Sequence, residues 1–74
     1  MIDQEMLAKI MADQGLNAPS SPEEFDKPFA DLGLDSLDIF GVLSEVETAV
    51  ARMVTDEDFR KMSTLNDIIL FAKI

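Results

Sequence analysis

The apolar residues of this 74-residue chain repeat with the spacing of helices, and no stretch alternates with the period of two that a β-strand requires. Residues 36–51 carry the strongest pattern, with one stripe at about 100° per residue made of Ile39, Val42, Leu43, Val46 and Val50. Residues 3–14 repeat it, with Gly15 where a C-terminal cap belongs and with Met6, Leu7, Ile10 and Met11 on the stripe. The spacing predicts an all-α fold.

Two further helices are predicted after residue 54. Thr55 precedes the acids of residues 56–58, which is typical of a helix start, so a short helix is expected through Lys61. Thr64 with Asp67 resembles a capping box. The helix it opens is expected to bury Leu65, Ile68, Ile69 and either Phe71 or Ala72. The prediction is a small four-helix bundle with three longer helices and one short one.

Residues 16–35 lack sustained periodicity and contain Pro19, Pro22, Pro28 and Gly33. A connection of about 20 residues in so small a domain is more often functional than idle. Its larger apolar residues are expected to tuck against the helices: Phe25, Phe29, Leu32 and Leu34. We expect residues 1–74 to form a single domain with a long loop between its first two helices.

The charge balance narrows the range of partners. Fifteen Asp and Glu against six Lys and Arg give a net charge of −9, which excludes nucleic-acid binding through phosphate neutralisation and favours basic protein partners. The longest apolar run, residues 68–72, is far below the roughly 20 residues that span a bilayer. The amino terminus lacks the pattern of a secretory signal. A cytoplasmic monomer without stable membrane insertion or a linker at either end, and hence free-standing, is expected.

The missing residue types exclude most chemistry. Without Cys or His the chain has no thiolate zinc site, no imidazole ligand and no Ser–His pair. Calcium sensing of the EF-hand type is excluded, because no Asp-x-Asp-x-Asp-Gly loop with a twelfth-position Glu is present. No nucleophile–base pair can be built. We therefore expect neither an enzyme nor a specific metal site.

Ser36 is the candidate functional residue, at the start of the strongest helix. Either it or Asp35 caps that helix, which is the ordinary role of such residues. Leu37, at roughly 160° from the core stripe, and Phe40, at roughly 100°, make a plausible docking spot beside it. With no His in the chain and no Lys within five residues, Ser36 cannot be activated internally. Ser36 is therefore predicted to be modified by another protein. A phosphate attached to Ser36 is expected to be stabilised by the helix N-terminus.

The run Asp31-Leu32-Gly33-Leu34-Asp35-Ser36-Leu37-Asp38 resembles the phosphopantetheine attachment motif of acyl carrier proteins. Residues 56–58 and 61–65 are similar to the family's third helix and the turn into its fourth. The resemblance covers essentially the whole chain and is firmest over residues 31–69, so it implies a single acyl-carrier-like domain over residues 1–74. It implies a four-helix bundle in which Ser36 carries 4'-phosphopantetheine, donated from coenzyme A by a Mg-dependent phosphopantetheinyl transferase. The thiol of that arm then holds acyl groups as thioesters.

The resemblance also implies partners and two sets of residues. The transferase and the acyl-loading and acyl-processing enzymes of fatty-acid, polyketide or related lipid biosynthesis are expected to present basic docking patches. The residues expected to meet these partners are Asp35, Leu37, Asp38, Phe40, Gly41, Glu45 and Glu47. An ordinary solvated face is the alternative for Glu45 and Glu47. An acyl chain is expected to be sheltered among residues that also serve plain packing: Ile39, Val42, Val46, Val50, Leu65 and Ile68.

Four positions depart from the pattern of primary fatty-acid carriers. Gly41 and Thr48 replace common glutamates, Phe40 is bulkier than usual and Ser44 is more polar. Gly41 lies roughly 200° from the core stripe. Internal packing is therefore not expected to explain a glycine at this position. The remaining explanations are that the backbone of a partner protein comes close there, or that the residue has changed by neutral drift. We hypothesise a specialised carrier serving a dedicated pathway. An aminoacyl or peptidyl carrier, and an unmodified acidic interaction module of the same fold, are the alternatives.

Overall fold

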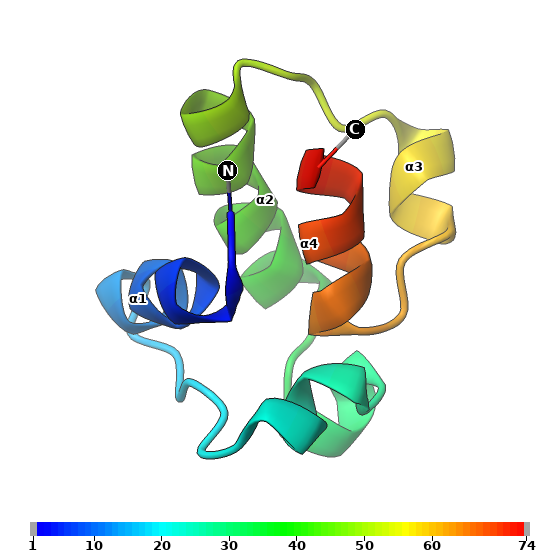
Figure 1. The fold of residues 1–74 in the computed structure, drawn as a ribbon. Helices are drawn as coiled ribbons and strands as arrows, with labels where there is room; N and C mark the ends of the chain where they lie inside the picture. The colour runs from blue at the N-terminus through cyan, green and yellow to red at the C-terminus, as the bar shows by residue number, and fades with distance from the viewer. Residues whose placement is uncertain (1, 74) are drawn as a thin grey trace.

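A computed structural model describes residues 2–73, and over that range it confirms the predicted all-α fold with three longer helices and a short third one. No strand is present among these residues, which hold only an isolated bridge between Pro28 and Thr64. Figure 1 shows α2 and α4 side by side, with α1 across one end and α3 at the edge. The helices are α1 (Gln4–Asp13), α2 (Ser36–Val50), α3 (Asp56–Arg60) and α4 (Leu65–Lys73).

Both ends of α1 are capped, and the glycine at the C-terminal end is the one predicted. The Asp3 side chain accepts a 2.8 Å hydrogen bond from the Met6 N–H and so caps the first turn. Gly15 follows the helix with φ of 78°, in the left-handed region that glycine enters without a Cβ penalty. On the predicted stripe, Leu7 and Met11 are buried whereas Met6 is 42% exposed. The stripe is therefore narrower than the sequence pattern indicates.

The long connection is more ordered than its lack of periodicity indicates. It contains two 3₁₀ helices, η1 (Pro22–Asp26) and η2 (Phe29–Leu32), which are too short to give a sequence period. The Phe29 N–H donates to the Ser63 carbonyl at 2.9 Å, and the Asn66 amide donates to Asp26 at 2.6 Å. These two hydrogen bonds tie the connection to the start of α4. The predicted apolar anchors are confirmed, because all four pack in or against the core: Phe25, Phe29, Leu32 and Leu34.

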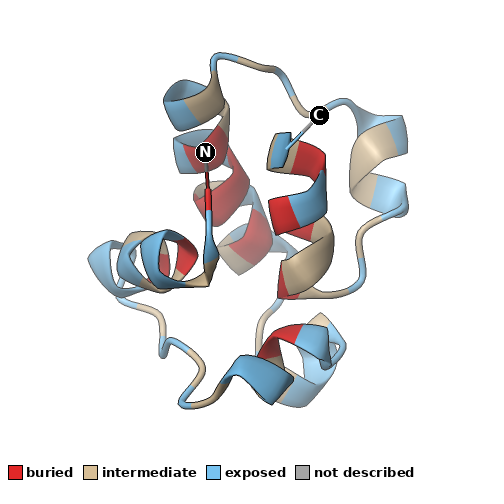
Figure 2. Cartoon of the chain, in the orientation of Figure 1, coloured by how far each residue is buried: buried red, intermediate tan, exposed pale blue. Residues whose placement is uncertain are grey.

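One core lies between α1, α2 and α4, where Figure 2 shows the buried segments of these helices facing inward. The sequence predicts that α4 buries either Phe71 or Ala72. Phe71 is the buried one, at 7% exposure, whereas Ala72 is half-buried. A single shared core makes the three longer helices depend on one another for stability. The buried cluster consists of Ile2, Leu7, Met11, Phe25, Ile39, Val42, Leu43, Val46, Leu65, Ile68 and Ile69.

Both predicted helix starts after residue 54 are confirmed. Thr55 and Asp58 exchange side-chain and backbone hydrogen bonds of 3.1 Å at the start of α3. Thr64 and Asp67 do the same at α4, with distances of 3.0 and 3.2 Å, and Asp67 also accepts from the Ser63 N–H at 2.8 Å. Partial burial opposes ionisation of Asp67, but its hydrogen bonds from Ser63 and Thr64 outweigh this and lower its pKa below 3.8.

The connection from α2 to α3 is pinned at both of its ends. Ala51 ends α2 in the left-handed region with φ of 55°. The Arg52 guanidinium donates to the Phe71 carbonyl at 2.6 Å and lies 4.2 Å from the centre of the Phe71 ring. The Val54 N–H donates to the Glu47 carboxylate at 2.7 Å. These contacts join the loop to α4 and α2.

Across residues 2–73, no helix combines the length and the apolar character needed to cross a membrane.

Candidate functional site

The first turn of α2 answers the question of which residue caps this helix. The Asp35 carboxylate accepts from the Asp38 N–H at 2.8 Å, and the Asp38 carboxylate accepts from the Asp35 N–H at 3.1 Å. This reciprocal pair is a capping box. Because Asp35 does the capping, Ser36 becomes the first residue of the helix with its hydroxyl free, and it is exposed. Of the two residues that the sequence offers as the cap, Asp35 is therefore the one that caps α2.

The Leu-Gly-Leu segment before Ser36 sets the entry angle of the helix. Gly33 has φ of 73°, which turns the chain out of η2 and toward α2. Its N–H donates to the Ala30 carbonyl at 3.1 Å, and the Leu34 N–H donates to the Phe29 carbonyl at 3.0 Å. Leu32 and Leu34 pack against the core on either side of this turn. Ser36 is therefore exposed but held on an anchored segment.

The surface beside Ser36 is apolar, as predicted. Leu37 is 79% exposed and Phe40 is 51% exposed. The Phe40 ring lies 4.7 Å, centre to centre, from the ring of Phe59 on α3, with the planes at 35°. This contact joins α2 to α3 across the outside of the bundle. Phe59 is missing from the predicted site, although it is the one apolar residue in the acidic sequence of α3, which was the available signal.

Gly41 is half-buried, and the one side chain that lies against it is the exposed end of Gln14. A Cβ at this position meets the Gln14 Oε1 atom at 2.8 Å. Gln14 is the residue that ends α1, so the end of that helix lies against this point of α2. The contact involves two segments far apart in sequence, and a helical wheel of α2 alone does not contain it.

The two glutamates predicted to meet partners are in different environments. Glu45 is exposed on α2, whereas Glu47 is half-buried and accepts the Val54 N–H at 2.7 Å. Residues two apart on a helix do not share a face. The structure therefore does not bring Glu45 and Glu47 together, and it gives Glu47 a role in holding the loop after α2.

The residues predicted to shelter an acyl chain do come together, as closely packed core. Exposure is 0% or 1% for five of the six, and Val50 is half-buried. None of the three surface hollows described next is lined by any of them. An acyl chain therefore needs the helices to part before it enters. The five are Ile39, Val42, Val46, Leu65 and Ile68.

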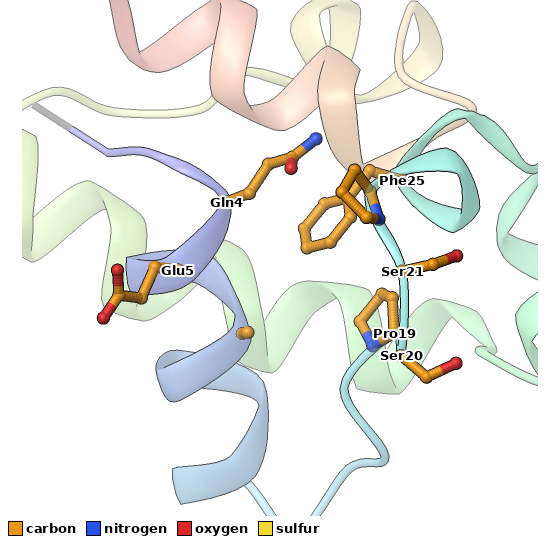
Figure 3. Close-up of a pocket in the computed structure, with 8 residues that line it drawn as sticks. Gln4, Glu5, Pro19, Ser20, Ser21 and Phe25 are labelled. Carbon is orange, nitrogen blue, oxygen red and sulfur yellow. The ribbon is translucent and has the colours of Figure 1, made fainter.

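Three surface hollows among residues 2–73 lie away from Ser36. One of about 180 Å³, shown in Figure 3, lies between α1 and the long connection, with Gln4 and Phe25 directed toward each other across it. The hydroxyls of Ser20 and Ser21 point away from it, so its polar groups do not converge on a ligand. A hollow of about 280 Å³ lies between α3 and α4, and one of about 330 Å³ lies at the end of α2. Neither contains a residue of the first turn of α2.

The chemistry available at this site is that of an acceptor. Within residues 2–73, no group of three or more Asp or Glu side chains is placed to hold a metal ion. In both Asp35 and Asp38, one carboxylate oxygen accepts a hydrogen bond of the capping box. The exposed Ser36 hydroxyl, with a helix N-terminus beneath it, fits a phosphodiester link to a long arm. The exposed hydroxyl can therefore act as the acceptor of a transferred group.

The site thus consists of an exposed serine on a capped helix, bordered by apolar and acidic side chains in a small helical bundle. The family of phosphopantetheine attachment site domains matches residues 6–71 of the chain. The chain therefore belongs to this family of carrier proteins, which are not catalytic and have a 4'-phosphopantetheine prosthetic group. Such carriers are modified by phosphopantetheinyl transferases and interact with partner enzymes. A search of curated proteins gave no match.

Proposed function

We propose that Ser36 bears the 4'-phosphopantetheine arm and that the chain presents acyl groups to the enzymes of a dedicated lipid or polyketide pathway. The observation that carries the proposal is the capping box, in which Asp35 takes the capping role and leaves the Ser36 hydroxyl exposed. When bound, the arm supplies the thiol that this Cys-free chain lacks, and acyl groups are held on it as thioesters.

Comparison with the other serines supports the choice of Ser36. The hydroxyls of Ser20 and Ser63 each donate to a carboxylate, Glu24 and Asp67 respectively, at 3.2 Å. Ser44 is exposed but lies in the middle of α2, away from the helix N-terminus. Ser36 alone combines a free hydroxyl, the first position of a long helix and the Asp-Ser-Leu motif.

The partner surface that we propose is centred on the first two turns of α2. Leu37 and Phe40 supply the exposed apolar contact, and exposed apolar side chains next to a modified residue favour docking. Asp35, Asp38 and Glu45 supply negative charge for Lys and Arg of the partner enzymes. Glu47 lies near the C-terminal end of α2, away from these turns, where it holds the loop that leads to α3. Rim charges of this kind act mainly on the rate of association.

The test is an intact mass before and after incubation with coenzyme A, Mg and a permissive phosphopantetheinyl transferase. The expected result is a gain of one phosphopantetheine by the unaltered chain and by Ser44→Ala, which is the matched control on the same helix. Ser36→Ala is expected to gain nothing. A folded chain, checked by circular dichroism, that takes no arm would contradict the proposal and favour the unmodified interaction module.

A further inference from the structure

The contact between Phe40 and Phe59 lies where an arm on Ser36 would first meet the bundle. Phe40 is four residues after Ser36, and residues at this spacing are neighbours on one helix face, with a rise of about 6 Å between them. Helical side chains lean toward the N-terminus, so the Phe40 ring leans toward Ser36. An arm that folds back along α2 therefore runs over this ring before any other part of that face.

The short helix α3 is held to the bundle mainly through Phe59. Its other four residues are charged: Asp56, Glu57, Asp58 and Arg60. Phe59 is half-buried and packs against the core, and its ring meets Phe40 at 4.7 Å. The ring pair thus spans the seam between α2 and α3. Breaking it is the least disruptive way to open that seam, because α1, α2 and α4 are tied together by the fully buried core.

Behind the seam the core has no room for cargo. Ile39 lies one residue before Phe40, at 1% exposure, and Val42 and Val46 are fully buried on the same helix. The hollows of the surface lie elsewhere, as described above. Entry of an alkyl chain from Ser36 thus requires both displacement of the ring pair and expansion of a close-packed interior, and each step opposes it.

We propose that the Phe40–Phe59 pair closes the apolar interior to cargo carried on Ser36 and so sets the class of acyl group that the chain carries. An alkyl chain barred from the interior stays in water, and the unfavourable exposed area grows with every methylene. The pair therefore selects short or polar acyl groups over long alkyl ones. This inference rests on Ser36 as the attachment point, and it goes beyond it by naming the cargo class and the residues that select it.

The test places an alkyl chain at position 36 without any transferase. Because the chain has no Cys, Ser36→Cys introduces a single thiol, which methyl or octyl methanethiosulfonate converts to a methyl or octyl disulfide. The readout is the rate at which a small thiol releases each group, since this exchange depends on access to the sulfur. With Phe40 present, the octyl and methyl groups are expected to be released at the same rate.

Removing the ring is expected to admit the octyl chain, because the space that the ring vacates in the seam between α2 and α3 shelters the alkyl chain without expansion of the interior. In Ser36→Cys with Phe40→Ala, the octyl group should be released about tenfold more slowly than the methyl group, because the buried chain draws the disulfide out of solvent. Leu37→Ala is the matched control, since Leu37 lies in the same turn, is more exposed at 79% and has no ring partner. It should leave the rates equal. Phe40→Val, which keeps a branched apolar side chain, replaces Phe40→Ala if that variant loses its helical circular dichroism.

Two results overturn the inference. The first is slow octyl release already in the chain that keeps Phe40, which means that the interior is open. The second is equal octyl and methyl release in folded Phe40→Ala or Phe40→Val, which means that the ring is not the barrier. Neither result depends on enzymatic modification, so a failure of Ser36 to accept phosphopantetheine is recognised separately, by its unchanged intact mass.

Discussion

Replacement of Gly41 by alanine is expected to stabilise the protein, and its size can be worked out from the structure. Gly41 lies in the interior of α2, where glycine costs about 1 kcal/mol relative to alanine. The added Cβ meets the Gln14 Oε1 atom at 2.8 Å and its Cδ atom at 3.6 Å. Gln14 is exposed, so its side chain can rotate away at a cost of a few tenths of a kcal/mol, an off-rotamer side chain being the upper limit at about 1 kcal/mol. The expected net gain is about 0.5–1 kcal/mol.

Urea unfolding followed by circular dichroism measures this gain as a rise in the midpoint at constant slope. The double variant Gly41→Ala with Gln14→Ala removes the obstruction, and it should add no more than about 0.5 kcal/mol beyond the sum of the single changes. Loss of stability in Gly41→Ala that the second change restores would show that the Gln14 side chain cannot rotate away. Loss that it does not restore would refute the reasoning.

Three further predictions concern the caps. Ala51→Gly should raise the free energy of unfolding by about 1 kcal/mol in urea, because φ of 55° strains alanine but not glycine; an unchanged or lower value would contradict this. Asp35→Ala should cost about 1 kcal/mol and Asp35→Asn a few tenths, since only the former removes the cap; equal losses in urea would contradict it. The pKa of Asp67 is lowered, so its stabilisation is complete above pH 3.8 and is lost as the pH falls through the lower folded-state value. The stability difference from Asp67→Asn should therefore shrink below pH 4 in thermal unfolding, and a constant difference would contradict this.

The sequence predicts those features of the fold that depend on neighbouring residues. The capping boxes of α3 and α4 each involve two residues three positions apart at the start of the helix, beginning with Thr55 and Thr64. The glycine after α1 is equally close to the helix end that it caps. The stripe on α2 is equally local, because a helix places residues at fixed angles whatever surrounds it. These signals give the four helices and the exposed position of Ser36 without knowledge of the tertiary structure.

Contacts between elements are the part that the sequence does not give. The Phe40–Phe59 pair joins two helices separated by a turn, and the obstruction at Gly41 comes from the end of α1. The bond from the Val54 N–H to Glu47 depends on the left-handed turn at Ala51, which no glycine marks in the sequence. In each case the role of the residue depends on where another segment lies.

In the candidate site, too, the features set by neighbouring residues are predictable from the sequence and the features set by contacts between elements are not. The capping box fixes Ser36 and is predictable from the order of Asp35, Ser36 and Asp38. The difference between Glu45 and Glu47 is not, since both are acids on the same predicted helix and only the folded loop separates their roles. The residues next to Ser36 in the sequence thus point to it as the proposed attachment site. The proposed docking surface and the proposed closure of the interior depend on how the helices pack together.

The central claim is that Ser36, rather than any of the other four serines, carries the phosphopantetheine arm. The most direct measurement is fragmentation mass spectrometry of the enzymatically modified chain, with the added mass assigned to a residue. The account predicts that every fragment containing Ser36 carries the added mass and that fragments containing only Ser20, Ser21, Ser44 or Ser63 do not. An arm found on one of those four residues, in a chain whose Ser36 is unmodified, would contradict it.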